Sequence, residues 1–187
     1  MDRGFKAWCE NISLQIRREL GQTKVTPLSP SDLAAYLDVR ILEPKLIDGI
    51  SNKSLNILGG KEKDNWSAIT VSNNGRDIIV YNPAHSLARR SSDLMHELSH
   101  LLIGHKPSTL LFVPDATIAL RSFDQKQEEE ATWLSGALLL PRVALVSIRQ
   151  SGLSSSEACE MFRVSNDLLN FRLNKTGVEA QFKRRRS

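Results

Sequence analysis

The chain has 187 residues, of which 41% are hydrophobic and 25% are charged, and its formal net charge is +4. These values predict an ordinary soluble globule with one domain, or one domain with a small appendage. No stretch approaches the ~20 apolar residues of a membrane span, and the first residues lack the apolar run of a secretory signal, so we expect no membrane role. The basic residues 183–186 are expected to be a solvated end.

The two cysteines, Cys9 and Cys159, lie far apart in the sequence. Their spacing matches no metal or redox motif. The sequence therefore predicts two free thiols and a reducing, cytoplasmic location.

The N-terminal part of the chain is predicted to form two helices and a short strand. Residues 2–20 place apolar side chains at helical spacing, which indicates an amphipathic helix packed on the core. Residues 29–37 begin with a serine cap and a proline in the first helical position, which predicts a short second helix. Residues 39–42 are expected to form a strand.

Two β-rich runs, residues 67–71 and 78–81, follow further along the chain. Asn73, Asn74 and Gly75 lie between them, and an Asn-Gly pair between such runs predicts a β-hairpin. One interpretation is that an exposed edge of this hairpin holds a substrate backbone by β-addition above a metal. The other is that the hairpin serves only as scaffold, and the sequence leaves both open.

Residues 96–100 read HELSH, an H-E-x-x-H motif. Histidines four residues apart lie one turn apart on a helix, so His96 and His100 can reach one metal ion. Glu97 lies beside the ion, where it can accept a proton from water, and this is the arrangement needed for zinc-assisted hydrolysis of an amide. The alternative is an amphipathic helix whose two histidines are satisfied in other ways.

The residues around the motif predict the helix that it needs. We expect Ser91 or Ser92 to cap the start, with Asp93 in the first turn. We expect Gly104 to end the helix, because a left-handed C-terminal residue is most easily a glycine. Leucines on either side of the motif form an apolar stripe, so the histidine pair is predicted on a buried element, where it needs a metal or an acidic partner.

Two histidines leave a catalytic zinc one protein ligand short. We reject His105, because HELSHLLIGH has one residue fewer between its second and third histidines than the metzincin motif, and a glycine ends the helix before it. The better source is the acidic run 128–130, which opens a helix that is apolar nearly all round and therefore buried. A carboxylate on the inner side of that helix needs a strong partner such as zinc. We expect Glu128 to be the ligand, with Glu130 as the reserve candidate.

Three segments together resemble the ImmA/IrrE family of metallo-endopeptidases. The first consists of residues 66–68 leading to 80–83, and the second is HELSHLLIGH, residues 96–105. The third is residues 128–141, which are similar to the family's E-x-x-A-N-x-F-A-x-x-L-L-x-P. The combination spans roughly residues 30–141 and is far more specific than H-E-x-x-H alone.

The resemblance implies a zinc peptidase that cuts a specific transcriptional repressor. Carried over residue by residue, it implies His96, His100 and Glu128 as metal ligands and Glu97 as the general base. Thr132 stands where the family has Asn or Asp, one turn after the ligand, and it would be a neutral and weaker partner for a histidine ring. A Leu-Ser pair in place of the family's Phe-Ala, two residues later, changes only packing.

Residues 155–165 resemble the first helix and turn of a helix-turn-helix, and residues 166–173 resemble its second helix. Arg172 and the basic tail favour contact with DNA. The second helix is nevertheless apolar enough to pack inward and is poor in side chains that read base edges. We expect packing or substrate contact, with direct nucleic-acid binding as the alternative.

The sequence as a whole predicts an α+β fold. A small zinc-peptidase domain would place a β-hairpin or small antiparallel sheet beside the H-E-x-x-H helix, followed by a mostly helical C-terminal part with a helix-turn-helix-like segment. The predicted divisions are 1–28 for an N-terminal helix and linker, 29–145 for the metallopeptidase core, and 146–187 for the C-terminal helices and basic tail.

The predicted function is a zinc-dependent, site-specific endopeptidase that cleaves a helix-turn-helix repressor. Zinc would lower the pKa of a water toward ~7, and Glu97 would carry its proton to the leaving amine. Tyr81, His85 and Arg172 are candidate donors to the oxyanion. The alternative function is a non-catalytic DNA-binding or adaptor regulator with a structural or vestigial metal site. The intact general base favours the enzyme.

Overall fold

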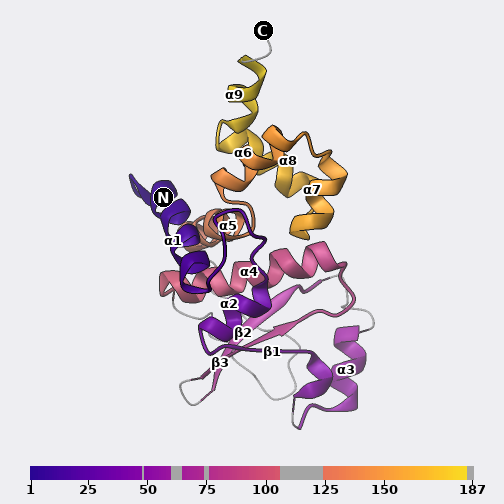
Figure 1. Cartoon of the computed structure of the whole chain (residues 1–187). Coiled ribbons are helices and arrows are strands. Elements are labelled where there is room, and N and C mark those ends of the chain that lie inside the picture. The colour runs from indigo at the N-terminus through magenta and orange to yellow at the C-terminus, as the bar shows by residue number, and fades with distance from the viewer. Residues whose placement is uncertain (48, 60–64, 74–75, 106–123, 185–187) are drawn as a thin grey trace.

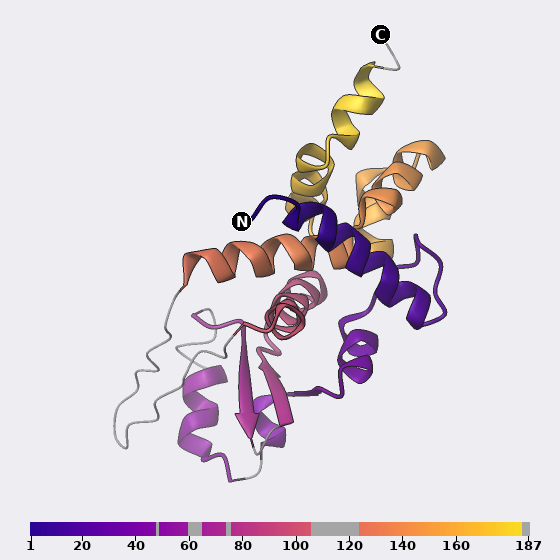
Figure 2. The same cartoon turned by 90° about the vertical axis from the view of Figure 1, so that its left-hand side faces the viewer.

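The computed structural model describes residues 1–47, 49–59, 65–73, 76–105 and 124–184. Within these residues, two long helices lie in the middle of the molecule, one crossing the view of Figure 1 and the other seen there nearly along its axis, with a small sheet below them and the C-terminal helices above. The long helices are α4 (Leu87–Ile103) and α5 (Gln125–Leu139). In the view turned by 90°, α4 is seen along its axis, between the sheet and α5 (Figure 2). The predicted α+β class is confirmed.

The sheet consists of β1 (Arg40–Leu42), β2 (Ala68–Asn73) and β3 (Arg76–Tyr81), in the order β1-β3-β2. β2 and β3 pair antiparallel as the hairpin predicted, although its turn, residues 74–75, lies outside the described residues. β1 pairs parallel with β3, so the sheet is mixed and not antiparallel throughout. The chain between β1 and β3 is long enough for the crossover that a parallel pair requires. Among the described strands, β2 lies at an edge.

The N-terminal helices pack on the same core as the rest of the chain. α1 (Phe5–Glu19) lies along α5, and its fully buried Arg17 donates a 2.7 Å hydrogen bond to the carbonyl of Leu138. α2 (Pro30–Tyr36) begins at the predicted cap, where the hydroxyl of Ser29 accepts from the following helix. Residues 1–28 therefore contribute to the core and do not stand apart from it.

Helix α4 begins five or six residues, about one and a half turns, earlier than the sequence predicted. Its N-cap is Ser86, whose Oγ accepts from the backbone of Arg89 at 3.3 Å, so the expected cap at Ser91 or Ser92 is wrong. Each of these serines has the chemistry of a cap, and the extra turn adds backbone hydrogen bonds and buries Ser91. The end of the helix is as expected, because Gly104 has a φ of +78°.

The C-terminal part consists of α6 (Arg142–Ser151), α7 (Ser155–Phe162), α8 (Asn166–Lys175) and α9 (Val178–Arg184). α7 and α8 are consecutive helices joined by the short connection 163–165. α8 faces inward, where it packs on α5 and α6 and buries Leu169, Arg172 and Leu173. This orientation places its apolar face on the protein core.

The remaining described elements are short. A 3-10 helix (Pro44–Leu46) and α3 (Asn52–Gly59) lie between β1 and β2. No single helix among the described residues has the length and apolarity needed to cross a membrane; α5 and α6 meet that requirement only as a pair bent by 43°. Cys9 and Cys159 are both free thiols.

Candidate metal centre

Three donor atoms converge where α4 passes the start of α5. His96 Nε2 lies 3.1 Å from His100 Nε2 and 3.1 Å from Glu128 Oε2, and His100 Nε2 lies 3.6 Å from Glu128 Oε1. Helical spacing brings the two histidines together. Asp124 caps the start of α5, which places Glu128 in the first turn of that helix, against α4. The structure thus assembles the three side chains that the sequence proposed as ligands.

The spacing of these atoms fits a tetrahedral metal. Zinc bonds of about 2.0–2.1 Å to nitrogen and oxygen place neighbouring tetrahedral ligands about 3.3 Å apart. The separations of His96 Nε2 from His100 Nε2 and from Glu128 Oε2, both 3.1 Å, are close to that edge length, and His100 approaches the other carboxylate oxygen of Glu128, Oε1, at 3.6 Å. Two ring nitrogens that face each other at 3.1 Å can share at most one proton, so a cation between them relieves the repulsion of their lone pairs.

Glu97 lies one residue along α4 from the first histidine and is 5% exposed. Its Oε2 accepts a hydrogen bond of 2.6 Å from Oγ1 of Thr70, which belongs to the edge strand β2. Thr70 could not be identified from the sequence, because a threonine within a strand carries no sign of the helix that it will face. The hydroxyl of Thr70 therefore connects Glu97, the expected general base, to the sheet.

Glu130 and His105, the candidates that the sequence ranked below Glu128, pair with each other. His105 Nε2 lies 3.3 Å from Glu130 Oε2. His105 Nδ1 lies 2.9 Å from Nδ1 of His100, on the side of that ring away from its Nε2. Neither residue joins the three converging donors.

The comparison with protein families agrees with this geometry. The model described as peptidase M78, IrrE N-terminal-like domain, matches residues 36–174. The chain belongs to peptidase family M78. This confirms the resemblance read from the sequence and supports a metallopeptidase-type function. A search of curated proteins gives no match. The matched region of this M78 chain includes α7 and nearly all of α8, so the helix-turn-helix-like pair lies within the family domain.

The candidate oxyanion donors of this M78 domain are held by other partners. The hydroxyl of Tyr81 donates to Glu43 at 3.0 Å, and burial together with this bond raises the pKa of Tyr81. His85 Nδ1 lies 2.8 Å from Asp93 Oδ2. Arg172 is fully buried and donates to a backbone carbonyl at the end of α5, so its assignment as an oxyanion donor is wrong. Tyr81 and His85 stay as predictions.

Thr132, the expected partner of a histidine ring, is exposed on α5. The backbone carbonyl of Thr132 accepts a hydrogen bond of 3.0 Å from Oγ of Ser135. In the part of the chain that the structure describes, the hydroxyl of Thr132 makes no hydrogen bond to His96 or His100. The expected contact of Thr132 with a histidine ring is therefore not made in the described part of the chain.

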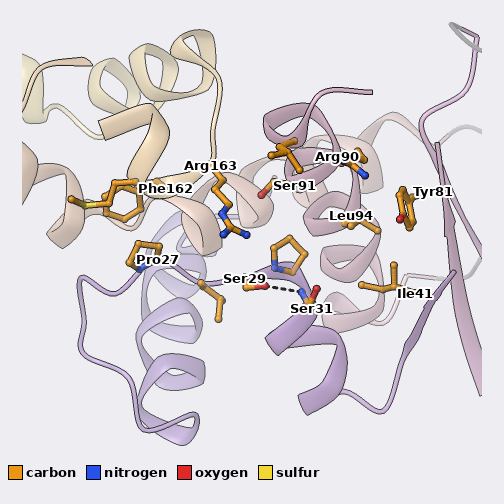
Figure 3. A pocket seen from close by; sticks show the side chains of 14 residues that line it. Pro27, Ser29, Ser31, Ile41, Tyr81, Arg90, Ser91, Leu94, Phe162 and Arg163 are labelled. Carbon is orange, nitrogen blue, oxygen red and sulfur yellow. Dashed lines mark hydrogen bonds between the residues drawn. The ribbon is translucent and has the colours of Figure 1, made fainter. Parts of the chain in front are cut away.

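A groove of about 420 Å³ lies between the start of α2, the first turns of α4 and the end of α7 (Figure 3). Arg163 reaches into it from the end of α7, and Arg90 and Leu94 line it from α4. At about 100° of rotation per residue, positions 90 and 94 lie on average about 120° around α4 from the two histidines of the motif. None of the three converging donors lines the groove, so it is separate from the candidate metal centre.

Proposed function

We propose that this M78 chain is a zinc-dependent endopeptidase. The observation that carries the proposal is the convergence of His96, His100 and Glu128, whose potential ligand atoms all lie within 4.8 Å of one another, with buried Glu97 next to His96 on the same helix. Two imidazoles and one carboxylate form a donor set typical of catalytic zinc in peptidases. The three side chains are 24%, 15% and 25% exposed, which leaves solvent access to the site.

When bound, zinc supplies an acidified water and polarises the scissile carbonyl. Glu97 accepts a proton from the attacking water while the oxygen of that water bonds to the carbonyl carbon. Glu97 then delivers the proton to the nitrogen of the leaving amine as the C–N bond breaks. Thr70 holds Oε2 of the carboxylate throughout and so fixes its orientation.

We further propose that the substrate backbone lies along β2. This strand lies at an edge of the described sheet, and its Thr70 contacts the general base. A peptide that pairs with β2 by β-addition would therefore pass beside Glu97. The proposed substrate is a helix-turn-helix transcriptional repressor in the cytoplasm, which is the class implied by the ImmA/IrrE resemblance.

The test compares three zinc-loaded proteins: wild type, Glu97→Gln, and Glu129→Gln as the matched control. Glu129 is exposed in the first turns of α5, so its substitution removes the same charge near the site without touching a proposed ligand. Each protein is mixed with a cell extract and with purified helix-turn-helix repressors, and new amino termini are identified by amine labelling and mass spectrometry.

We expect new amino termini with wild type and Glu129→Gln. We expect a rate lower by at least about 10²-fold with Glu97→Gln at equal zinc content. Equal cleavage by Glu97→Gln would overturn the mechanism. A wild-type protein that takes up no zinc would overturn the proposed function. Cleavage confined to extract proteins of another class would overturn the repressor as substrate and leave the peptidase in place.

A further inference from the structure

A second histidine and a second carboxylate lie behind the metal ligand His100. Nδ1 of His105 lies 2.9 Å from Nδ1 of His100, and the two ring centroids are 5.0 Å apart. Nε2 of His105 lies 3.3 Å from Oε2 of Glu130. The side chains of His105 and Glu130 are only 7% and 10% exposed, so both bonds are largely shielded from water.

The end of helix α4 places His105 beside His100. Gly104 adopts a φ of +78°, a left-handed conformation that residues with a side chain rarely take. The backbone N–H of His105 then returns to the carbonyl of His100 at 2.9 Å, which is the six-residue hydrogen bond of a Schellman motif. This turn folds His105 back against the last turn of the helix and not away into solvent.

The hydrogen positions along this chain of contacts follow from metal binding. If His100 offers the lone pair of Nε2 to the metal, its Nδ1 carries the hydrogen and donates it to Nδ1 of His105. Nε2 of His105 then carries a hydrogen, which it donates to Glu130. Every donor meets an acceptor. The reverse direction would leave a hydrogen on Nε2 of His100, where it would block the metal.

We propose that His105 and Glu130 are a positioning pair that holds His100 in the ring orientation and tautomer required for metal binding. Carboxylates and carbonyls that accept from a metal-bound histidine perform this role in many metal sites. Here His105 lies between the two groups, so that His100 on α4 is connected to Glu130 on α5 through two hydrogen bonds. The proposal rests on the proposed function insofar as it requires a metal at the three donors.

The first test measures zinc affinity by competition with a chromophoric chelator. The variants are His105→Phe, His105→Gln, Glu130→Gln and the control Glu129→Gln. We expect His105→Phe and Glu130→Gln to weaken zinc binding by about 10–100-fold and the control to leave it within about twofold of wild type. Unchanged affinity in Glu130→Gln and His105→Phe, with wild type binding zinc, would overturn the positioning pair and leave the proposed function standing. A wild type that binds no zinc would overturn both.

His105→Gln separates hydrogen bonding from packing. An amide oxygen can accept from His100 while the amide nitrogen donates to Glu130, so this variant should bind zinc more tightly than His105→Phe. Equal weakening by Gln and Phe would assign the effect to lost packing and overturn the proposal.

The second test reads the tautomer directly, without metal and without activity. Nitrogen-15 NMR of the histidine side chains at about pH 8, where imidazole is neutral, distinguishes a hydrogen on Nδ1 from one on Nε2. We expect His100 to carry it on Nδ1 in wild type and to shift toward Nε2 in His105→Phe. The same tautomer in both folded proteins would overturn the proposal, and Glu130→Gln, which preserves side-chain shape, provides the same comparison should His105→Phe not fold.

Discussion

Oγ1 of Thr70 donates a 2.6 Å hydrogen bond to Oε2 of Glu97, which links the edge strand β2 to the motif helix α4. Both residues are buried, at 9% and 5% exposure. A general base has to stay within hydrogen-bond distance of the proton that it takes, so the orientation of its carboxylate matters as much as its presence. The bond also connects β2, the strand along which the substrate is proposed to lie, directly to the expected general base.

Substitution of Thr70 tests this link. Thr70→Val keeps the side-chain shape and removes the hydroxyl, and a hydrogen bond to a charged group is worth about 1.5–3 kcal/mol, so we expect kcat to fall by about 10-fold or more. Thr70→Ser keeps the hydroxyl and is expected to stay close to wild type. Zinc content should be equal in all three proteins. Equal rates for the Val and Ser variants would show that the hydroxyl has no part in positioning Glu97.

The zinc content of purified protein tests Glu128 as the third ligand. We expect about one zinc per chain in wild type and a clear loss in Glu128→Ala, because two histidines alone leave the metal short of a protein ligand. Glu129→Ala is the control, since it removes a neighbouring exposed carboxylate from the same helix. Metal analysis by mass spectrometry measures both. Full zinc occupancy in Glu128→Ala would require a different third ligand.

Arg172 is expected to stabilise the fold and not to act in catalysis or DNA contact. It is fully buried, donates to the carbonyl of Leu140 at 3.1 Å, and pairs with Glu10 at 2.5 Å. Arg172→Ala would leave a cavity in the core and remove the partner of Glu10, which is 23% exposed, so urea unfolding should show a loss of about 2–5 kcal/mol. Lys175→Ala, an exposed change on the same helix, should stay within about 0.5 kcal/mol of wild type.

A tight fit around Arg172 also explains a glycine inside helix α5. A Cβ at Gly136 would lie 3.0 Å from Cδ of Arg172, so the helix approaches the arginine more closely than an alanine would allow.

DNA binding that persisted at normal affinity in Lys175→Ala but disappeared in folded Arg172→Ala would contradict the structural role assigned to the arginine.

Alkaline pH tests the burial of Cys9. Burial raises the pKa of its thiol from 9.0 to about 12. Because the folded pKa is above the unfolded one, the contribution of this burial to stability is present below pH 9.0 and is lost as the pH rises toward 12. Between about pH 8 and about pH 10, the stability of wild type relative to Cys9→Ala should fall by about 1 kcal/mol, measured by urea unfolding. A difference that stays constant with pH would contradict the shifted pKa.

Local features of the fold were predictable from the sequence because their causes are local. The cap of α2, the pairing of β2 with β3, and the end of α4 at Gly104 each depend on residues within a few positions of the feature. The start of α4 was misplaced because several serines offered the same cap chemistry. The parallel pairing of β1 with β3 lacks any signal in the strand itself, since it is decided by how the crossover packs.

The sequence by itself determined the family, the motif helix and the motif residues His96, Glu97 and His100 of the candidate site. The H-E-x-x-H spacing places two imidazoles on one helical face whatever the rest of the fold does. Only the tertiary structure decided which carboxylate of the run 128–130 meets them, because that depends on how α5 lies against α4. It likewise decided that Thr70 holds Glu97 and that Glu130 meets His105, since these contacts join segments whose separation in the chain carries no information about their distance in space.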